Sequence, residues 1–157
     1  MKYKYLLFSV IVIIGILFSQ THTAYSIEQT PENFVREFYI WYSEGLNRDE
    51  LPELDDEIYK YVCESTVDRL RIEHKMGSRD YNYFIDTNDN WPELFTYIIA
   101  RQAVKINDDL SLVPLGFGET KARSAPHLII FVQKGKNGLR IIKVDGLASE
   151  FYAPTRN

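Results

Sequence analysis

Cysteine is almost absent from this chain: Cys63 is the only one among 157 residues. No disulfide can therefore form within one molecule, and stability must come from a packed core. Clusters of lysine and arginine are also lacking. Without its first 26 residues the chain has 16 basic and 22 acidic side chains, a net charge near −6. We predict an acidic, unpatterned surface, which excludes nucleic acid and anionic membranes as partners.

Long apolar runs are missing too, except at the N-terminus. Lys2 and Lys4 precede the uncharged run 5–18, and small residues at Ala24 and Ser26 fit a cleavage site. This pattern predicts a secretory signal peptide over residues 1–26. The run is shorter than the roughly 20 residues of a membrane-spanning helix, so no stable membrane insertion is expected after cleavage. The sequence predicts a periplasmic or secreted protein.

Three helices are predicted at the start of the exported part. Thr30 and Pro31 fit the start of a first helix, in which Phe34, Phe38 and Trp41 share a face. Gly45 is its predicted end. A shorter helix is predicted around Asp56–Val62, and a third one begins after Ser65 and ends before Gly77.

Four strands are predicted to follow the helices. Apolar and alternating patterns cover residues 95–106, 110–118, 127–134 and 139–146. Pro114 cannot donate a backbone hydrogen bond, so it indicates an edge strand or a bulge. We predict one α+β domain over residues 27–147, with three helices on a four-stranded antiparallel sheet. Residues 148–157 are predicted to be a C-terminal tail.

Four short motifs occur in an order that resembles a known family. They are FVREFYIWY, DYNYFIDTNDNW, LSLVPLGFG and LRIIKVDGL. The chain is similar to the YbjP-like family of small exported bacterial proteins of unknown function. This resemblance implies a cystatin-like or nuclear-transport-factor-like fold, with helices cupped against a curved sheet. The chain lacks the lipidated cysteine of the lipoprotein members, and the family supplies no established reaction.

The stretch from Asp80 to Trp91 is the most chemically distinctive part of the chain. Asp86, Asn88 and Asn90 begin like a calcium-binding EF-hand loop, but Trp91 and Tyr97 stand where glycine and glutamate are required. A weaker metal site that uses Asp86 and Asp89 remains open, and so do three other interpretations. In the first, Asp80 and Asp86 form a catalytic pair. Alternatively, the polar side chains stabilise turns while the aromatic ones pin the loop to the core. In the third, the stretch is a partner-binding surface made by Asp80, Tyr81, Tyr83, Asp86, Asp89 and Trp91.

Other candidate sites carry weaker patterns. Cys63 with His74 or His127 would make a nucleophilic pair, but no local signature supports it. Trp41 and Tyr42 would line a cavity if the helices and the sheet enclose one. We predict no cofactor and no metal. The sequence favours a non-enzymatic domain that binds a protein partner in the cell envelope, with an immunity or inhibitor protein as one variant. The alternative is a small-molecule-binding or enzymatic domain that uses a cavity between helices and sheet.

Overall fold

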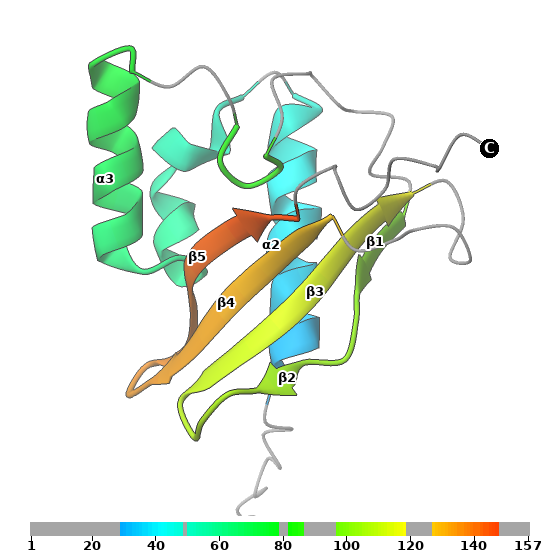
Figure 1. Cartoon of the computed structure of the whole chain (residues 1–157). Helices are drawn as coiled ribbons and strands as arrows, with labels where there is room; N and C mark the ends of the chain where they lie inside the picture. The colour runs from blue at the N-terminus through cyan, green and yellow to red at the C-terminus, as the bar shows by residue number, and fades with distance from the viewer. Residues whose placement is uncertain (1–28, 49, 79–81, 87–96, 119–126, 148–157) are drawn as a thin grey trace, which may run out of the picture.

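A computed structural model of the chain describes residues 29–48, 50–78, 82–86, 97–118 and 127–147. In these residues two α-helices and two 3₁₀-helices precede five strands (Figure 1). The predicted signal peptide and the predicted tail lie outside the described residues. None of the described helices has the length and apolar character needed to cross a membrane.

Helix α2, Pro31–Leu46, forms as the sequence predicts. The Thr30 hydroxyl accepts a hydrogen bond from the Asn33 N–H at 3.4 Å, and Pro31 occupies the first turn, where its missing N–H costs nothing. One face of the helix is buried against the sheet and the following segments. Its buried members include Phe34, Val35, Phe38, Tyr39 and Tyr42.

The connection after α2 contains two short 3₁₀-helices, η1 (Pro52–Leu54) and η2 (Asp56–Lys60). The Asp55 carboxylate accepts a hydrogen bond from the Glu57 N–H at 2.8 Å and so caps η2. The shorter helix predicted around Asp56–Val62 is present as this 3₁₀-helix, and it ends at Lys60.

Helix α3, Glu64–Lys75, begins after Cys63, which is its N-cap and makes no side-chain capping bond. The predicted cap at Ser65 is thus two residues late. Gly77 has a φ of +61°, the left-handed conformation in which glycine commonly ends a helix. Its predicted role is confirmed.

The sheet has five antiparallel strands, and Figure 1 shows α2 behind it and α3 beside its β5 edge. The strands are β1 (Tyr97–Ala100), β2 (Val104–Lys105), β3 (Leu110–Gly118), β4 (Leu128–Gly135) and β5 (Gly138–Gly146). Their order is β1-β3-β4-β5, and β2 also pairs with β3. The predicted fold, three helices on a four-stranded sheet of the cystatin-like or nuclear-transport-factor-like type, is therefore wrong: in the described part of the chain, two α-helices pack with five strands.

Pro114 explains why one predicted strand became two. It lies inside β3, an interior strand. At this point the adjacent segment between β1 and β2 has three residues, 101–103, opposite only two residues of β3, 113 and 114. The Arg101 N–H donates to the Pro114 carbonyl at 2.9 Å, and the Ala103 N–H turns away to the Glu32 carboxylate of α2 at 2.6 Å. The strand pair is thus interrupted beside the residue that cannot donate.

The outer edge of β5 is covered by three other segments. Ile141 donates to the Tyr61 carbonyl at 2.7 Å and accepts from the Cys63 N–H at 2.9 Å. The Thr66 hydroxyl donates to the Ile142 carbonyl at 2.9 Å. The Val144 N–H donates to the Tyr83 hydroxyl at 3.1 Å. An edge satisfied in this way offers few backbone groups to another strand.

The contact between Glu32 and Ala103 predicts a pH-dependent stability. Burial raises the pKa of Glu32, but the hydrogen bonds from the Ala103 N–H, its own N–H and the Thr30 hydroxyl outweigh this, and the net pKa is lowered. Its folded pKa lies below its unfolded value of about 4.3, so the stabilisation is complete above that pH and disappears as the pH falls through the folded pKa.

We expect Glu32→Gln to lower the free energy of unfolding by about 1 kcal/mol at pH 7. The difference from the unmodified protein should shrink between pH 5 and pH 3, as Glu32 becomes protonated. Urea unfolding at several pH values measures it, with Glu44→Gln on the exposed side of α2 as the control. An equal difference at pH 7 and pH 3 would contradict this assignment.

Candidate functional site

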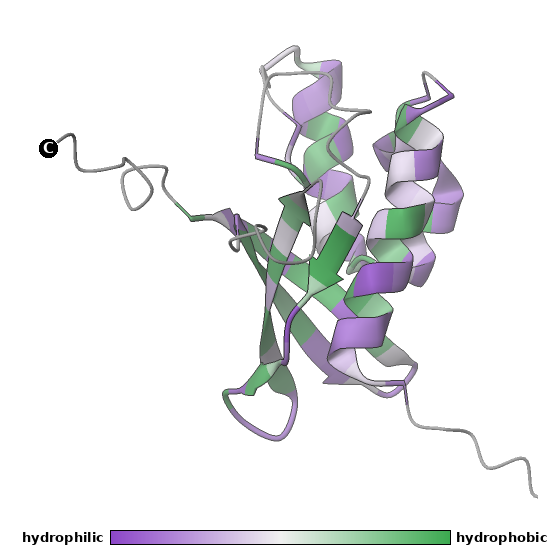
Figure 2. Ribbon diagram, turned by 90° about the vertical axis from the view of Figure 1, so that its right-hand side faces the viewer, coloured by the Kyte–Doolittle hydropathy of each residue, from purple (hydrophilic) through white to green (hydrophobic). Residues whose placement is uncertain are grey.

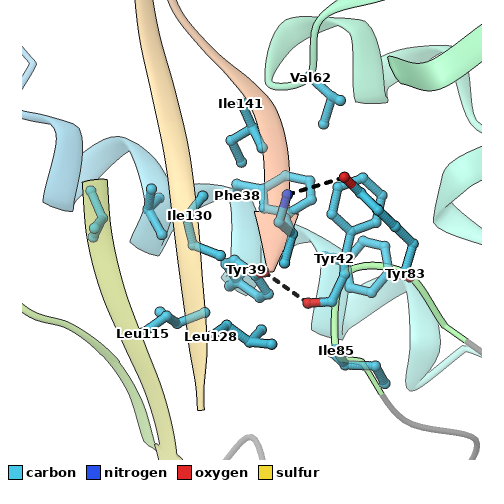
Figure 3. Close-up of a cluster of buried hydrophobic side chains, with 14 of the residues drawn as sticks. Phe38, Tyr39, Tyr42, Val62, Tyr83, Ile85, Leu115, Leu128, Ile130 and Ile141 are labelled. Atoms are coloured by element: carbon cyan, nitrogen blue, oxygen red, sulfur yellow. Dashed lines mark hydrogen bonds between the residues drawn. The ribbon is translucent and has the colours of Figure 1, made fainter. Parts of the chain in front are cut away.

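The structure describes residues 82–86 of the stretch that the sequence singled out. These residues pack against α2 and β5 (Figure 3). Tyr83 is buried, accepts a hydrogen bond from the Val144 N–H, and has the Arg69 guanidinium 5.1 Å from its ring centre. The Phe84 side chain is fully buried, and its carbonyl accepts a hydrogen bond from the Tyr39 hydroxyl at 2.8 Å. This part of the stretch therefore anchors the chain to the core.

The other predicted contact residues of that stretch are placed differently. Asp86 is exposed and has a φ of +51°. A Cβ atom on Gly146 would overlap its carboxylate, so the two residues are in close contact. Asp80, Tyr81, Asp89 and Trp91 lie outside the described residues. The partner-binding role of this set stays a prediction.

Tyr42 is buried and joins three segments. Its hydroxyl lies 2.6 Å from Glu53 Oε1 in η1 and 2.7 Å from Asn82 Oδ1. Burial and the neighbouring Glu53 carboxylate raise the pKa of Tyr42 well above its ordinary value. The hydroxyl therefore stays protonated, and with its single proton it donates to one of these two oxygens at a time.

Trp41 points elsewhere, because successive helix residues are turned by about 100° from each other. Its indole stacks on the Tyr61 ring with centroids 5.5 Å apart and an angle of 27°. The two residues predicted to line a cavity are in edge-to-face contact, with ring centroids 6.4 Å apart, but Tyr42 is fully buried in the core and Trp41 is only partly buried.

Trp41 lines a surface pocket of about 190 Å³ between the end of α2 and the following connection. Gly45 and Pro52 bring these two segments together: a Cβ atom on Gly45 would lie 2.6 Å from Pro52 Cγ. Arg48 and Glu50 form an ion pair at 2.7 Å in the pocket wall. The full lining is Trp41, Gly45, Arg48, Glu50, Leu51, Pro52 and Asp55.

Acidic residues are frequent in the chain around this pocket. Residues 44–57 contain seven acidic side chains and one basic one, Arg48. Two basic residues from outside this range neutralise part of that charge: Lys60 pairs with Glu57 at 2.6 Å, and Arg71 pairs with Asp56 at 3.0 Å. With these two residues counted, the net charge is −4, out of −6 for the chain after residue 26. The prediction of an unpatterned acidic surface did not identify this run. Leucine and proline residues separate the acidic residues of 44–57, so the sequence shows no long uninterrupted block of like charge.

The described residues do not bring Cys63 together with a histidine. His74 lies eleven residues further along the same helical segment, about 16 Å away at 1.5 Å per residue. His127 precedes β4 at the opposite end of the strand from Val132, which pairs with the Ile141 that Cys63 contacts. Cys63 Sγ instead lies 3.4 Å from the Ser65 hydroxyl. No group of three or more potential metal ligands occurs in the part of the chain described above.

The centre of the space between α2 and the sheet is filled by side chains, and a pocket of about 260 Å³ lies at its edge, beside Thr30, Pro31 and Val132. Phe38, Tyr39 and Phe84 are fully buried at the centre, with ring centroids of Phe38 5.0 Å from those of both partners. Leu115, Leu128 and Ile130 approach from the sheet (Figure 3). A ligand cavity at the centre of this interface would need the volume that these residues occupy.

Two solved structures share this fold. One is a chain of the type VI native effector–immunity complex Tae3–Tai3 from Ralstonia pickettii, with 24% identity and a TM-score of 0.67. The match covers 76% of this chain and 96% of the other. The second comes from the selenomethionine form of that complex, with 26% identity, a TM-score of 0.62, and 74% and 96% coverage. No protein-family model and no curated protein matches the chain.

The contact between Gly45 and Pro52 gives a test of how the pocket is built. Alanine is favoured over glycine in a helix by about 1 kcal/mol. At position 45, however, its Cβ would overlap the Pro52 ring, and overpacking costs about 1–3 kcal/mol. We expect Gly45→Ala to give a net loss of about 1 kcal/mol and a shift in Trp41 fluorescence, measured by urea unfolding in a Trp91→Phe background.

Glu44→Ala is the matched control, because it places alanine at the adjacent, exposed position of the same helix. It should change stability by less than about 0.5 kcal/mol. If Gly45→Ala stabilises the protein instead, the close packing of α2 on Pro52 is refuted.

Proposed function

We propose that this protein is the exported, immunity-type member of an effector–immunity pair: a non-catalytic protein that binds and neutralises an effector. The single observation that carries the proposal is the match to a chain of the Tae3–Tai3 complex, which spans 96% of that chain. The fold match alone assigns neither role. The choice of the immunity role rests on the chemistry of the described residues.

Two features support binding rather than catalysis. Among the described residues no histidine lies within reach of Cys63, so Cys63 and a histidine do not form a nucleophile–base pair in this part of the chain. The centre of the interface between α2 and the sheet is packed with aromatic rings, which occupy the volume that a substrate would need there. A pocket at the edge of this interface, between the start of α2 and strands β3 to β5, has about 260 Å³, below the roughly 300–1,000 Å³ of small-molecule sites. The predicted signal peptide fits an effector that acts outside the cytoplasm.

A capture experiment tests the binding role. The full chain with a C-terminal tag is expressed in the cells that produce it, and proteins retained from the envelope fraction are identified by mass spectrometry. We expect one stoichiometric partner that re-forms the complex from purified components. A folded, soluble protein that retains no stoichiometric partner would contradict the proposal.

A growth experiment tests the immunity role. The identified partner is expressed with an export signal in a neutral host, with and without this protein. We expect the partner alone to stop growth and co-expression to restore it. A partner that binds tightly but leaves growth unchanged would retain the binding role and refute the immunity role.

A further inference from the structure

We propose that the Trp41 pocket and its acidic surroundings are the surface that receives the partner, and that the partner inserts an apolar side chain flanked by arginine or lysine. The inference rests on the proposed function and adds the location of the site and the chemistry of the partner. We call this surface the acidic pocket face; its test residues are Trp41, Glu44, Glu50, Leu51 and Asp55.

The pocket has the shape of an anchor site for one side chain. Its volume of about 190 Å³ lies below the roughly 300–1,000 Å³ of small-molecule sites. Trp41 is held by stacking on Tyr61 and by Phe38, whose ring centre lies 6.0 Å away. Because the aromatic wall is already fixed, its side chains lose little conformational entropy when a partner binds. In protein interfaces, such preformed pockets bind the inserted side chains that contribute most of the binding energy.

Exposed apolar side chains beside the pocket extend its contact area. Leu51 lines it and is 52% exposed, and Leu54 in η1 is 45% exposed. Ile40, next to Trp41 on α2, is also exposed. Apolar residues at the centre with charged residues around them are the usual arrangement of a protein interface.

The charge selects the occupant. Residues 44–57 together with the paired Lys60 and Arg71 carry a net charge of −4, so the acidic pocket face attracts a basic protein surface and accelerates its association. A second copy of this chain would bring the same acidic charge and be repelled. An anionic membrane would be repelled for the same reason. A basic protein partner is the occupant that the charge favours.

The outer face of the sheet is the strongest competing surface. In Figure 1 no described helix covers the face of the sheet turned to the viewer, and Val104, Leu112 and Phe131 pair across it. Figure 2 shows the strands largely in the colour of hydrophobic residues. Nothing in the structure indicates what covers this face. Ile106 near it is 53% exposed, which makes it the matched comparison for Leu51.

Site-specific photo-crosslinking locates the interface without disturbing the charge. A benzophenone amino acid replaces Leu51 in one variant and Ile106 in the other, within the full chain in its own cells. We expect the Leu51 variant to crosslink the partner identified by capture and the Ile106 variant to crosslink none. Crosslinking from position 106 but not from position 51 would overturn the inference and assign the partner to the sheet.

Charge reversal then measures the contribution of the acidic pocket face. We expect Glu44→Lys with Leu51→Arg to raise the Kd for the purified partner at least about ten-fold at low salt, with a smaller effect in high salt. The matched control is Asp108→Lys with Ile106→Arg, at a turn of similar exposure. Circular dichroism and urea unfolding confirm that both variants are folded.

The outcomes separate this inference from the proposed function. If the unmodified protein binds its partner and both double variants bind equally well, the acidic pocket face is not the site, and the proposed function stands. If the partner is captured by the unmodified protein but a second copy of this chain crosslinks at position 51, the face is a dimer interface and the inference fails. If the unmodified protein has no partner, the inference fails together with the function.

Discussion

The aromatic side of α2 is the contact on which the rest of the structure depends. Phe38 packs its ring against Phe84, and the Tyr39 hydroxyl holds the carbonyl of the same residue. One turn on, Tyr42 reaches both Glu53 and Asn82. One helix face thus fixes the connection after α2 and the segment 82–86, two pieces of chain with little regular structure of their own. Each ring adds buried area, and each hydroxyl satisfies a polar partner that would otherwise be costly to bury.

This arrangement also determines where the pocket lies. Because Tyr42 must turn inward, Trp41 is directed away from the centre of the core and toward Tyr61 and the connection. Gly45 then allows Pro52 to approach the helix, which closes the pocket wall. The segment that carries the negative charge is therefore held against the helix by two adjacent residues, Pro52 on Gly45 and Glu53 on Tyr42. The carboxylates of the connection after α2 are therefore held in a defined position beside the helix.

The parts of the fold that depend on local chemistry could be predicted from the sequence. Thr30 and Pro31 start α2, Gly77 ends α3, and the turn between β4 and β5 follows from residues 135–138, where Gly138 has a φ of +97°. The parts that depend on distant contacts could not. The split between β1 and β2 needs Glu32 to bind the Ala103 N–H, 71 residues away. The 3₁₀ connection needs Pro52 to meet Gly45. The sequence did suggest that the aromatic side chains of residues 80–91 pin this stretch to the core, but not that the Tyr83 hydroxyl would accept a hydrogen bond at the edge of β5.

Two segments that each combine acidic with aromatic or apolar side chains have different roles in the fold. In residues 82–86 the aromatic side chains point inward and are buried in the core. In residues 44–57 the pattern is the reverse: Pro52 is buried, while Leu51 and Leu54 remain at the surface among the carboxylates. Most of the net negative charge of the chain after residue 26 lies in this connection and its ion pairs, so its surface favours contact with basic groups over acidic ones.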